Sequence, residues 1–305
     1  MQTFDPAALE CLAAIVEEGG FERAARRLHI TQSAVSQRLR ALEAQVGTVL
    51  IVRSRPLKPT AAGLLLLKHT RQMRLLRADL EREMRELAPS ESPGPREQER
   101  ISLAINADSI ATWALPALDA LARQGLPLEI ITDDQDFTHE WLREGQVLGC
   151  VTTVKQALRG CKVVPLGAMA YMAVAQPAYA REHLPQGLTP HGFQGVPFIA
   201  FNRKDDMQAE FVARAVGLRR VSLHQLFVPS SEGQVRGALA GWGASVVPEL
   251  LVRGLVEQGA LVDVAPGTRV PVQLYWHCWN LESALLDQLS AALTGAARQA
   301  LDAAR

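Results

Sequence analysis

A row of hydrogen-bonding side chains lies on one face of a predicted helix that begins near residue 32. Spacings of three and four residues bring together Ser33, Ser36, Gln37 and Arg40, and the helix N-terminus adds Gln32 beside them. Short polar and amide side chains at the N-terminal end of a helix are suited to reading base edges in the major groove of DNA. The alternative is a solvated helix face with no partner.

Basic residues gather around this polar face, although the chain as a whole is neutral. Its 305 residues include 32 Lys and Arg and 32 Asp and Glu. Between Gly19 and Thr60, however, there are eight basic residues and two acidic ones. Such a local excess of positive charge is typical of a segment that binds the phosphates of a nucleic acid. The candidates for phosphate or guanine contacts are Arg38, Arg40, Arg53, Arg55 and Lys58.

Three short helices and a β-ribbon are expected to hold these side chains in place. Asp5 caps the first helix, and Thr31 caps the third, after a second helix over 21–28. Two short helices joined by a tight turn form a helix-turn-helix. A strand at 50–53 and the basic turn at 55–59 add a wing. The sequence therefore predicts a winged helix-turn-helix DNA-binding domain over residues 1–60.

A long helix without proline is predicted over residues 61–88. An apolar stripe at spacings of three and four residues follows its second half: Met73, Leu76, Leu80 and Met84. A helix with such a stripe and no obvious surface to pack on predicts a coiled-coil dimerisation arm. Packing of the stripe on the chain's own body is the alternative. The segment 89–100, which is rich in proline and serine at its start, then forms a hinge.

Strands alternate with helices in residues 101–305, which predicts an α/β domain with ligands bound at the carboxyl ends of its strands. The length of this region favours two lobes, one over about 101–172 and 275–305 and the other over about 173–274. The expected strands are 101–105, 128–132, 148–152, 171–175, 198–201, 226–228 and 245–247. The first two expected helices are 112–123 and 137–144.

Sequence patterns of several other protein classes are missing. There is no phosphate-binding loop, zinc-protease motif, nucleophile elbow or dinucleotide-binding glycine motif, so neither an enzyme nor a bound cofactor is expected. The four cysteines are scattered, which predicts reduced thiols in a cytoplasmic protein and no metal site, with a redox pair of Cys150 and Cys161 left open. Neither a signal peptide nor a membrane span is predicted.

The segment 21–43, FERAARRLHITQSAVSQRLRALE, resembles the winged helix-turn-helix of the LysR-type transcriptional regulators. The similarity continues through Gly47, Arg53 and the sequence TAAG at 60–63. It implies a regulator that binds double-stranded operator DNA as a dimer or tetramer, with RNA polymerase as a further partner. It also implies a two-lobed effector domain folded like a periplasmic binding protein. The alternative from another class is a nonspecific chromosome-organising DNA-binding protein.

Three short segments of the body resemble one branch of this family, which senses lysine and arginine and controls basic amino-acid export. They are NADSIATW at 106–113, SSE at 230–232 and LYWH at 274–277. The resemblance implies L-lysine or L-arginine as the effector. A regulator that senses another small metabolite is the alternative.

The turn between the strand 101–105 and the next helix is a candidate effector site. Its free backbone N–H groups can bind a carboxylate, and a basic amino acid also needs anionic partners for its two cationic groups. We favour Asp133 and Asp134 for the cationic side chain. The full set of candidates is Asp108, Ser109, Thr112, Asp133, Asp134, Asp205, Asp206, Ser231 and Glu232. The alternative for each acidic residue is a helix cap or a solvated loop charge.

Overall fold

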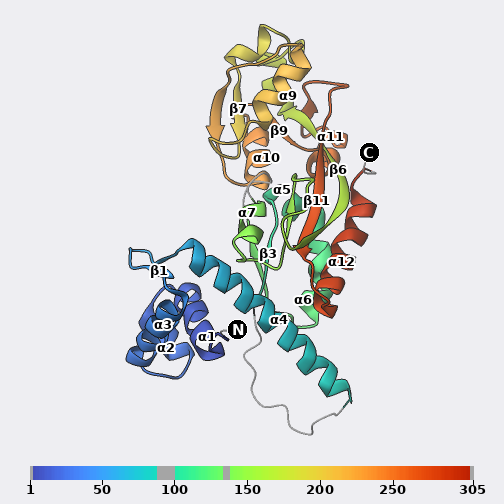
Figure 1. Cartoon of the computed structure of the whole chain (residues 1–305). Coiled ribbons are helices and arrows are strands. Elements are labelled where there is room, and N and C mark those ends of the chain that lie inside the picture. The colour runs from blue at the N-terminus through green and yellow to red at the C-terminus, as the bar shows by residue number, and fades with distance from the viewer. Residues whose placement is uncertain (1–2, 88–99, 133–137, 303–305) are drawn as a thin grey trace. The chain divides into compact units, whose positions relative to one another are not determined.

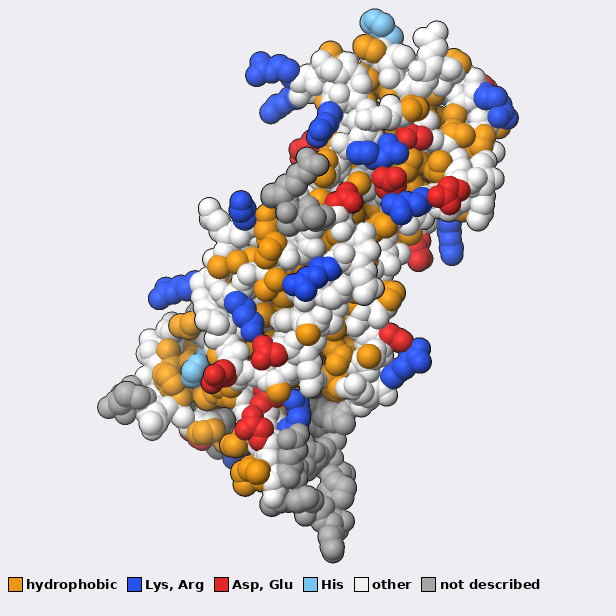
Figure 2. All heavy atoms as spheres, turned by 90° about the vertical axis from the view of Figure 1, so that its right-hand side faces the viewer, with side chains coloured by type: hydrophobic (Ala, Val, Ile, Leu, Met, Phe, Trp, Pro, Cys, Tyr) orange, Lys and Arg blue, Asp and Glu red, His pale blue; other side chains and the backbone are white. Residues whose placement is uncertain are grey.

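The computed structural model describes residues 3–87, 100–132 and 138–302. The chain divides into two compact units. One contains residues 1–98 with 140–148 and 281–287, and the other contains residues 99–139, 149–280 and 288–305. Figure 1 shows the helices and strands coloured in chain order, and Figure 2 shows one face of the molecule with its side chains coloured by type. No helix in the described part of the chain is long and apolar enough to cross a membrane.

Three helices form the N-terminal head: α1 (Pro6–Glu17), α2 (Phe21–Arg27) and α3 (Gln32–Val46). The predicted caps are confirmed, because a carboxylate oxygen of Asp5 accepts from the N–H of Ala7 at 3.0 Å and Thr31 Oγ1 accepts from the N–H of Ala34 at 3.1 Å. The three helices share one apolar core, which includes Leu12, Ile15, Ala24, Val35 and Leu39. Because this core uses the inner face of α3, the outer face is left for polar side chains.

The predicted wing and long helix follow the head: β1 (Ile51–Val52), β2 (Lys58–Pro59) and α4 (Ala61–Leu87). The two strands pair antiparallel. Thr60 joins the wing to α4, since its Oγ1 accepts from the N–H of Gly63 at 3.1 Å. A Cβ atom on Gly63 would lie 2.2 Å from the backbone oxygen of Leu50. Glycine at this position therefore allows α4 to begin close against the wing.

The second unit is built on a seven-stranded sheet in which β4, β3, β5, β11 and β6 lie side by side, with β9 and β10 pairing with β6. β3 is parallel to β4 and β5, whereas β11 is antiparallel to β5 and β6. The bounds are β3 (Ile101–Ala104), β4 (Leu128–Ile131), β5 (Gly149–Thr152), β6 (Cys161–Ala175), β9 (Ser245–Pro248), β10 (Val262–Asp263) and β11 (Val270–Trp279).

A second, two-stranded sheet pairs β7 (Pro197–Ala200) with β8 (His224–Phe227) in parallel. The helices of the body are α5 (Ala107–Ser109), α6 (Leu115–Arg123), α7 (Thr138–Arg143), α8 (Pro177–His183), α9 (Met207–Val216), α10 (Ser231–Leu239), α11 (Glu249–Glu257) and α12 (Ala284–Ala300). A 3₁₀ turn at Gly192–Gly195 precedes β7. The predicted α/β fold is confirmed.

Strand β6 is longer than predicted, because residues 171–175 are only its second part. Pro165 and Gly167 disfavour a continuous strand in the sequence. In the structure they pair with Tyr275 and Leu274 of β11, and the register shifts between those two residues. This β-bulge accommodates the proline inside the sheet. As a result β6 and β11 both run through the predicted lobe boundaries and join the two lobes.

The helix after β3 also begins earlier than the predicted residue 112. It starts with α5 at Ala107, continues through a π-helical turn at Ile110–Ala114 and ends as α6. Asp108 therefore lies in the first turn of a helix rather than in a loop before it. π-helical turns are frequent at functional sites.

Candidate DNA interface and effector pocket

The predicted polar face of α3 lies on the outside of the head. Gln32, Ser33, Gln37 and Arg40 are exposed, and Ser36 is partly exposed. The opposite face of the helix is buried in the core described above. The structure therefore brings together the hydrogen-bonding side chains that base readout requires.

Two of the candidate residues, the N-cap of α3 and one residue within α3, have partners inside the chain. The Thr31 hydroxyl caps the helix, as described above. Arg38 is exposed but lies beside the row of polar residues, and its guanidinium group approaches the Cys11 thiol of α1. Burial raises the pKa of this thiol, and the hydrogen bond from Arg38 lowers it by less. Arg38 thus reaches toward α1, which the sequence did not indicate.

The wing places its basic residues next to α2. Arg55 and Lys58 are exposed, and the guanidinium group of Arg53 lies over the ring of Phe21, 5.6 Å from its centroid. A cation above an aromatic face is attracted by the ring. This contact holds the Arg53 side chain beside the helix-turn-helix.

The apolar stripe of α4 is exposed in the structure. The exposed fractions are 38% for Met73, 42% for Leu76, 58% for Leu80 and 54% for Met84. Four large apolar side chains in one exposed row are unusual for a surface that stays in water.

A pocket in the second unit contains two of the predicted acidic residues. It is lined by Asn106, Ala107, Asp108, Tyr171, Phe201, Asp205, Met207, Gln208, Gln234 and Val246. Asp108 accepts a hydrogen bond from the Tyr171 hydroxyl at 2.5 Å. Burial raises the pKa of Asp108, hydrogen bonds from Ser231 and Tyr171 act in the opposite direction, and the nearby charge of Asp205 raises it further.

Asp205, which also lines this pocket, is held in place by backbone N–H groups. Its carboxylate accepts from the N–H groups of Phe201 and Met207, both at 2.9 Å. Burial raises the pKa of Asp205, and these two hydrogen bonds partly oppose the effect. Gln208 is fixed by a pair of hydrogen bonds with the backbone of Val246, at 2.9 Å and 2.7 Å. The two carboxylates therefore have defined positions.

The pocket is anionic and has polar atoms free to bind a ligand. No Lys, Arg or His is among the described residues that line it. Asn106 and Ser109 are buried, and within the described ranges Asn106 Oδ1 and Ser109 Oγ have no hydrogen-bond partner. Buried polar atoms are normally paired. Since Asn106 lines the pocket, a ligand with cationic and hydrogen-bonding groups would satisfy both the carboxylates and Asn106 Oδ1.

The other candidate effector residues have different places. Ser231 is buried beside Asp108. Thr112 Oγ1 donates to the backbone oxygen of Asp108 at 2.6 Å, so its hydroxyl is used within its own helix. Asp206 and Glu232 are exposed and do not line the pocket, because they begin α9 and α10 on the solvent side. Their role in effector binding stays a prediction. Asp133 and Asp134 lie outside the described residues.

Sequence reasoning missed several lining residues that lie inside regular elements. Tyr171 is the one polar side chain in the apolar run 168–175, and Gln208 and Gln234 are buried polar residues in the first turns of α9 and α10. A polar group on a buried face is a signal that could have found them. Cys150 and Cys161, left open as a redox pair, are not joined by a disulfide in the structure, and burial strongly raises the pKa of Cys150.

Family models match most of the chain. The bacterial regulatory helix-turn-helix protein model of the lysR family matches residues 6–64, and the LysR substrate binding domain model matches residues 95–298. The chain belongs to the LysR family of bacterial transcriptional regulators. Members of this family bind operator DNA and act as oligomers. The predictions of a DNA-binding regulator and of a protein that is not an enzyme are thereby confirmed.

Individual relatives are similar over nearly the full length. The chain is 43% identical to the HTH-type transcriptional regulator ArgP of Aeromonas salmonicida, over 99% of both chains. Its structure is similar to ArgP from Mycobacterium tuberculosis, with a TM-score of 0.85, 38% identity and coverage of 99% and 100%. It is also similar to full-length LysG from Corynebacterium glutamicum with the effector Arg bound, with a TM-score of 0.74, 33% identity and coverage of 98% and 99%. These relatives confirm the resemblance to this branch of the family.

Proposed function

We propose that this regulator binds L-arginine or L-lysine in the pocket around Asp108 and Asp205, and that it thereby controls a gene for basic amino-acid export. The main support is the pair of partly buried carboxylates in a pocket lined by no described cation. A basic amino acid carries two cations and one carboxylate, so its net positive charge complements such a pocket. The similarity to LysG with bound Arg supports the same ligand class.

The polar groups of the pocket suit the parts of a basic amino acid. Asp108 and Asp205 would accept hydrogen bonds from its two cationic groups, and the free Oδ1 of Asn106 is a third acceptor. The hydroxyl of Ser109, which has no partner among the described residues, is the proposed donor to the ligand carboxylate. Charge-assisted hydrogen bonds of this kind are stronger than neutral ones. The pair Asp133 and Asp134 is retained as a further proposed partner for the cationic side chain.

Calorimetry with arginine and with citrulline tests this assignment. Citrulline has nearly the shape of arginine but an uncharged side chain. If carboxylates recognise the side-chain cation, arginine should bind the unmodified protein at least about tenfold more tightly than citrulline, since charged hydrogen bonds contribute about 1.5–3 kcal/mol. Equal affinities would contradict recognition of the cation. Absence of binding by both arginine and lysine would leave the effector unassigned.

The outer face of α3 and the wing are proposed to bind the operator. Ser33, Ser36, Gln37 and Arg40 would read bases, and Arg53, Arg55 and Lys58 would contact phosphates. Thr31 and Gln32 begin the helix and would approach the DNA backbone. Two copies paired through the α4 stripe, as a dimer or within a tetramer, would bind two half-sites in the cytoplasm. RNA polymerase stays a predicted further partner.

Substitutions on α3 and the wing should separate base readout from phosphate binding. Gln37→Ala should weaken binding to the operator by about 1–3 kcal/mol and relax the base preference at one position. Arg53→Ala should weaken binding to all duplexes alike and reduce the salt dependence, because a phosphate contact is lost. Fluorescence anisotropy with operator and unrelated duplexes at several salt concentrations measures both effects. Unchanged discrimination in Gln37→Ala would show that another face of α3 reads the bases.

A further inference from the structure

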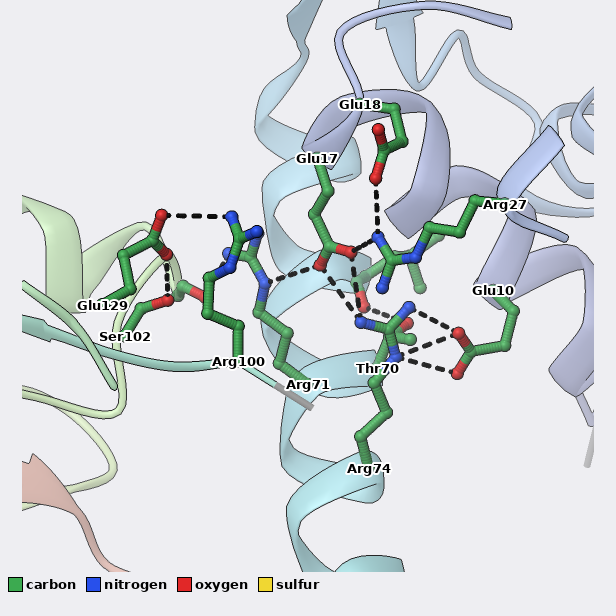
Figure 3. A network of polar contacts seen from close by, with 12 residues as sticks. Glu10, Glu17, Glu18, Arg27, Thr70, Arg71, Arg74, Arg100, Ser102 and Glu129 are labelled. Atoms are coloured by element: carbon green, nitrogen blue, oxygen red, sulfur yellow. Dashed lines mark hydrogen bonds and ion pairs between the residues drawn. The ribbon is translucent and has the colours of Figure 1, made fainter. Parts of the chain in front are cut away.

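A cluster of ion pairs joins three helices of the N-terminal unit around Glu17, near the end of α1 (Figure 3). Its carboxylate contacts Nη1 of Arg27 on α2 at 2.6 Å. It also contacts two arginines of α4, Arg71 through Nε at 3.3 Å and Arg74 through Nη1 at 3.1 Å. One carboxylate therefore bridges the helix-turn-helix and the long helix.

A second carboxylate on the same face of α1 strengthens the link to α4. Glu10 lies two helical turns before Glu17, and it accepts hydrogen bonds from Nε of Arg74 at 3.0 Å and 2.9 Å and from Nη2 at 2.5 Å. The guanidinium group of Arg74 is thus shared between two carboxylates. Planar groups paired through several hydrogen bonds fix direction as well as distance.

The centre of the cluster is largely shielded from water, whereas the side chains of Glu10 and Arg27 at its edge are 38% and 31% exposed. The exposed fractions of the side chains are 20% for Glu17, 17% for Arg71 and 14% for Arg74. Burial acts to raise the pKa of Glu17, but the three neighbouring arginines together hold this pKa below its usual value. Glu17 therefore stays ionised over the neutral range. Networks of this kind stabilise more than isolated surface pairs do.

The apolar contacts between the head and α4 do not by themselves fix the orientation of the head relative to α4. Leu66 and Leu67, in the first turns of α4, pack on the core of the head. Hydrophobic contact is non-directional, so it holds the two bodies together without fixing their rotation. Arg71 and Arg74 act one to two turns further along α4, where a small rotation would displace them most.

We propose that Glu17 is a positioning residue that sets the orientation of the recognition helix α3 relative to α4, and thereby the spacing of the half-sites that two paired heads can bind. The proposal rests on the pairing of two copies through α4 proposed above. Glu17 itself points toward α2 and α4, and no DNA contact is assigned to it. Two heads bind one operator well only if the distance between their recognition helices matches the spacing of the half-sites.

The test compares Glu17→Gln with Glu81→Gln. Glu81 forms an ion pair with Arg77 on the same helix α4, at 3.1 Å, but these side chains are 54% and 81% exposed. Both variants lose one carboxylate charge, and only Glu17→Gln disrupts the cluster. The DNA probes are an operator selected from random duplexes with the unmodified protein, a single half-site, and operators with base pairs inserted between the half-sites.

Glu17→Gln should bind the single half-site as the unmodified protein does, and light scattering should show the same oligomer. Its affinity for the intact operator should fall by about tenfold or more, because linked binding of two heads contributes about 10²–10⁴-fold. Its preference for one spacing should also flatten, whereas Glu81→Gln should keep both properties. Arg74→Gln removes the α4 side of the same ion pairs and should reproduce the effect. This variant also tests the proposal if Glu17→Gln fails to fold.

An unchanged spacing preference in folded Glu17→Gln or Arg74→Gln would overturn the proposal. Equal losses on the single half-site and on the operator would also overturn it, since the residue would then act on the head alone. An unmodified protein that is monomeric and indifferent to spacing would instead disprove pairing through α4. That result is distinguishable, because it appears before any substitution is made.

Discussion

Asp108→Asn should lower the affinity for arginine by about 30-fold to several thousand-fold while operator binding persists. Asp108 is partly buried, and its carboxylate accepts a hydrogen bond from the Tyr171 hydroxyl, so the substitution removes a charge and keeps a hydrogen-bond acceptor. Loss of one partner of a buried, charged ligand group costs about 2–5 kcal/mol, because the remaining charge is desolvated and unpaired. Calorimetry with arginine measures the loss, and anisotropy with operator DNA confirms that the head still functions.

Two further variants give this prediction its controls. Asp206→Asn removes an exposed carboxylate next to the pocket and should leave arginine affinity within about twofold, as expected of a screened surface charge. Asp133→Asn with Asp134→Asn tests the pair that the sequence favours for the cationic side chain. Full affinity in Asp108→Asn together with loss in that double variant would move the cation site away from Asp108.

The DNA-binding head could be predicted almost completely from the sequence, because its signals are local. The cap at Asp5, the cap at Thr31 and the stripe through Val35 and Leu39 each depend on residues within one or two helical turns. The side chain of Arg38 is the exception. Its approach to Cys11 depends on the packing of α1 against α3, which no local pattern records.

The effector pocket could be predicted only in part, because its residues are far apart in sequence. Asp108 and Asp205 follow strands, and the rule that ligands bind at the carboxyl ends of strands found both. Tyr171 falls in the predicted strand 171–175, but its hydroxyl donates to Asp108, which lies 63 residues earlier in the chain, so no local pattern assigned it to the pocket. Pro165 hid only the first part of the same strand, β6. The bulge that accommodates this proline arises from pairing with β11, more than a hundred residues later in the chain.

Asp206 and Glu232 also show that the sequence could predict the pocket only in part. Asp206 follows Asp205 directly, and Glu232 follows Ser231. In each pair the first residue is at least partly buried and the second is exposed to solvent. At a helix start, consecutive side chains point about 100° apart. Composition and spacing can therefore identify an acidic turn. Which residue of that turn faces the ligand depends on how the turn packs against the rest of the domain.

Leu80→Asp is expected to separate the paired copies and to abolish high-affinity binding to the two-half-site operator. Leu80 is the most exposed of the four stripe residues, at 58%. Pairing of two α4 helices would bury it, and a buried, ionised and unpaired carboxylate would then cost several kcal/mol. The heads themselves do not depend on this side chain, so affinity for a single half-site should persist. Light scattering and anisotropy measure the two effects.

The conservative variant Leu80→Met tests whether the effect of Leu80→Asp comes from the loss of apolar contacts between two α4 stripes. Methionine keeps an apolar side chain of similar volume, and such exchanges usually cost less than about 1.5 kcal/mol in a packed core. Leu80→Met should therefore retain the oligomer and the operator affinity. If Leu80→Asp keeps the oligomer as well, the exposed stripe of α4 is not the pairing surface. The heads would then have to be held together through the effector domains, and the distance between them would no longer depend on α4.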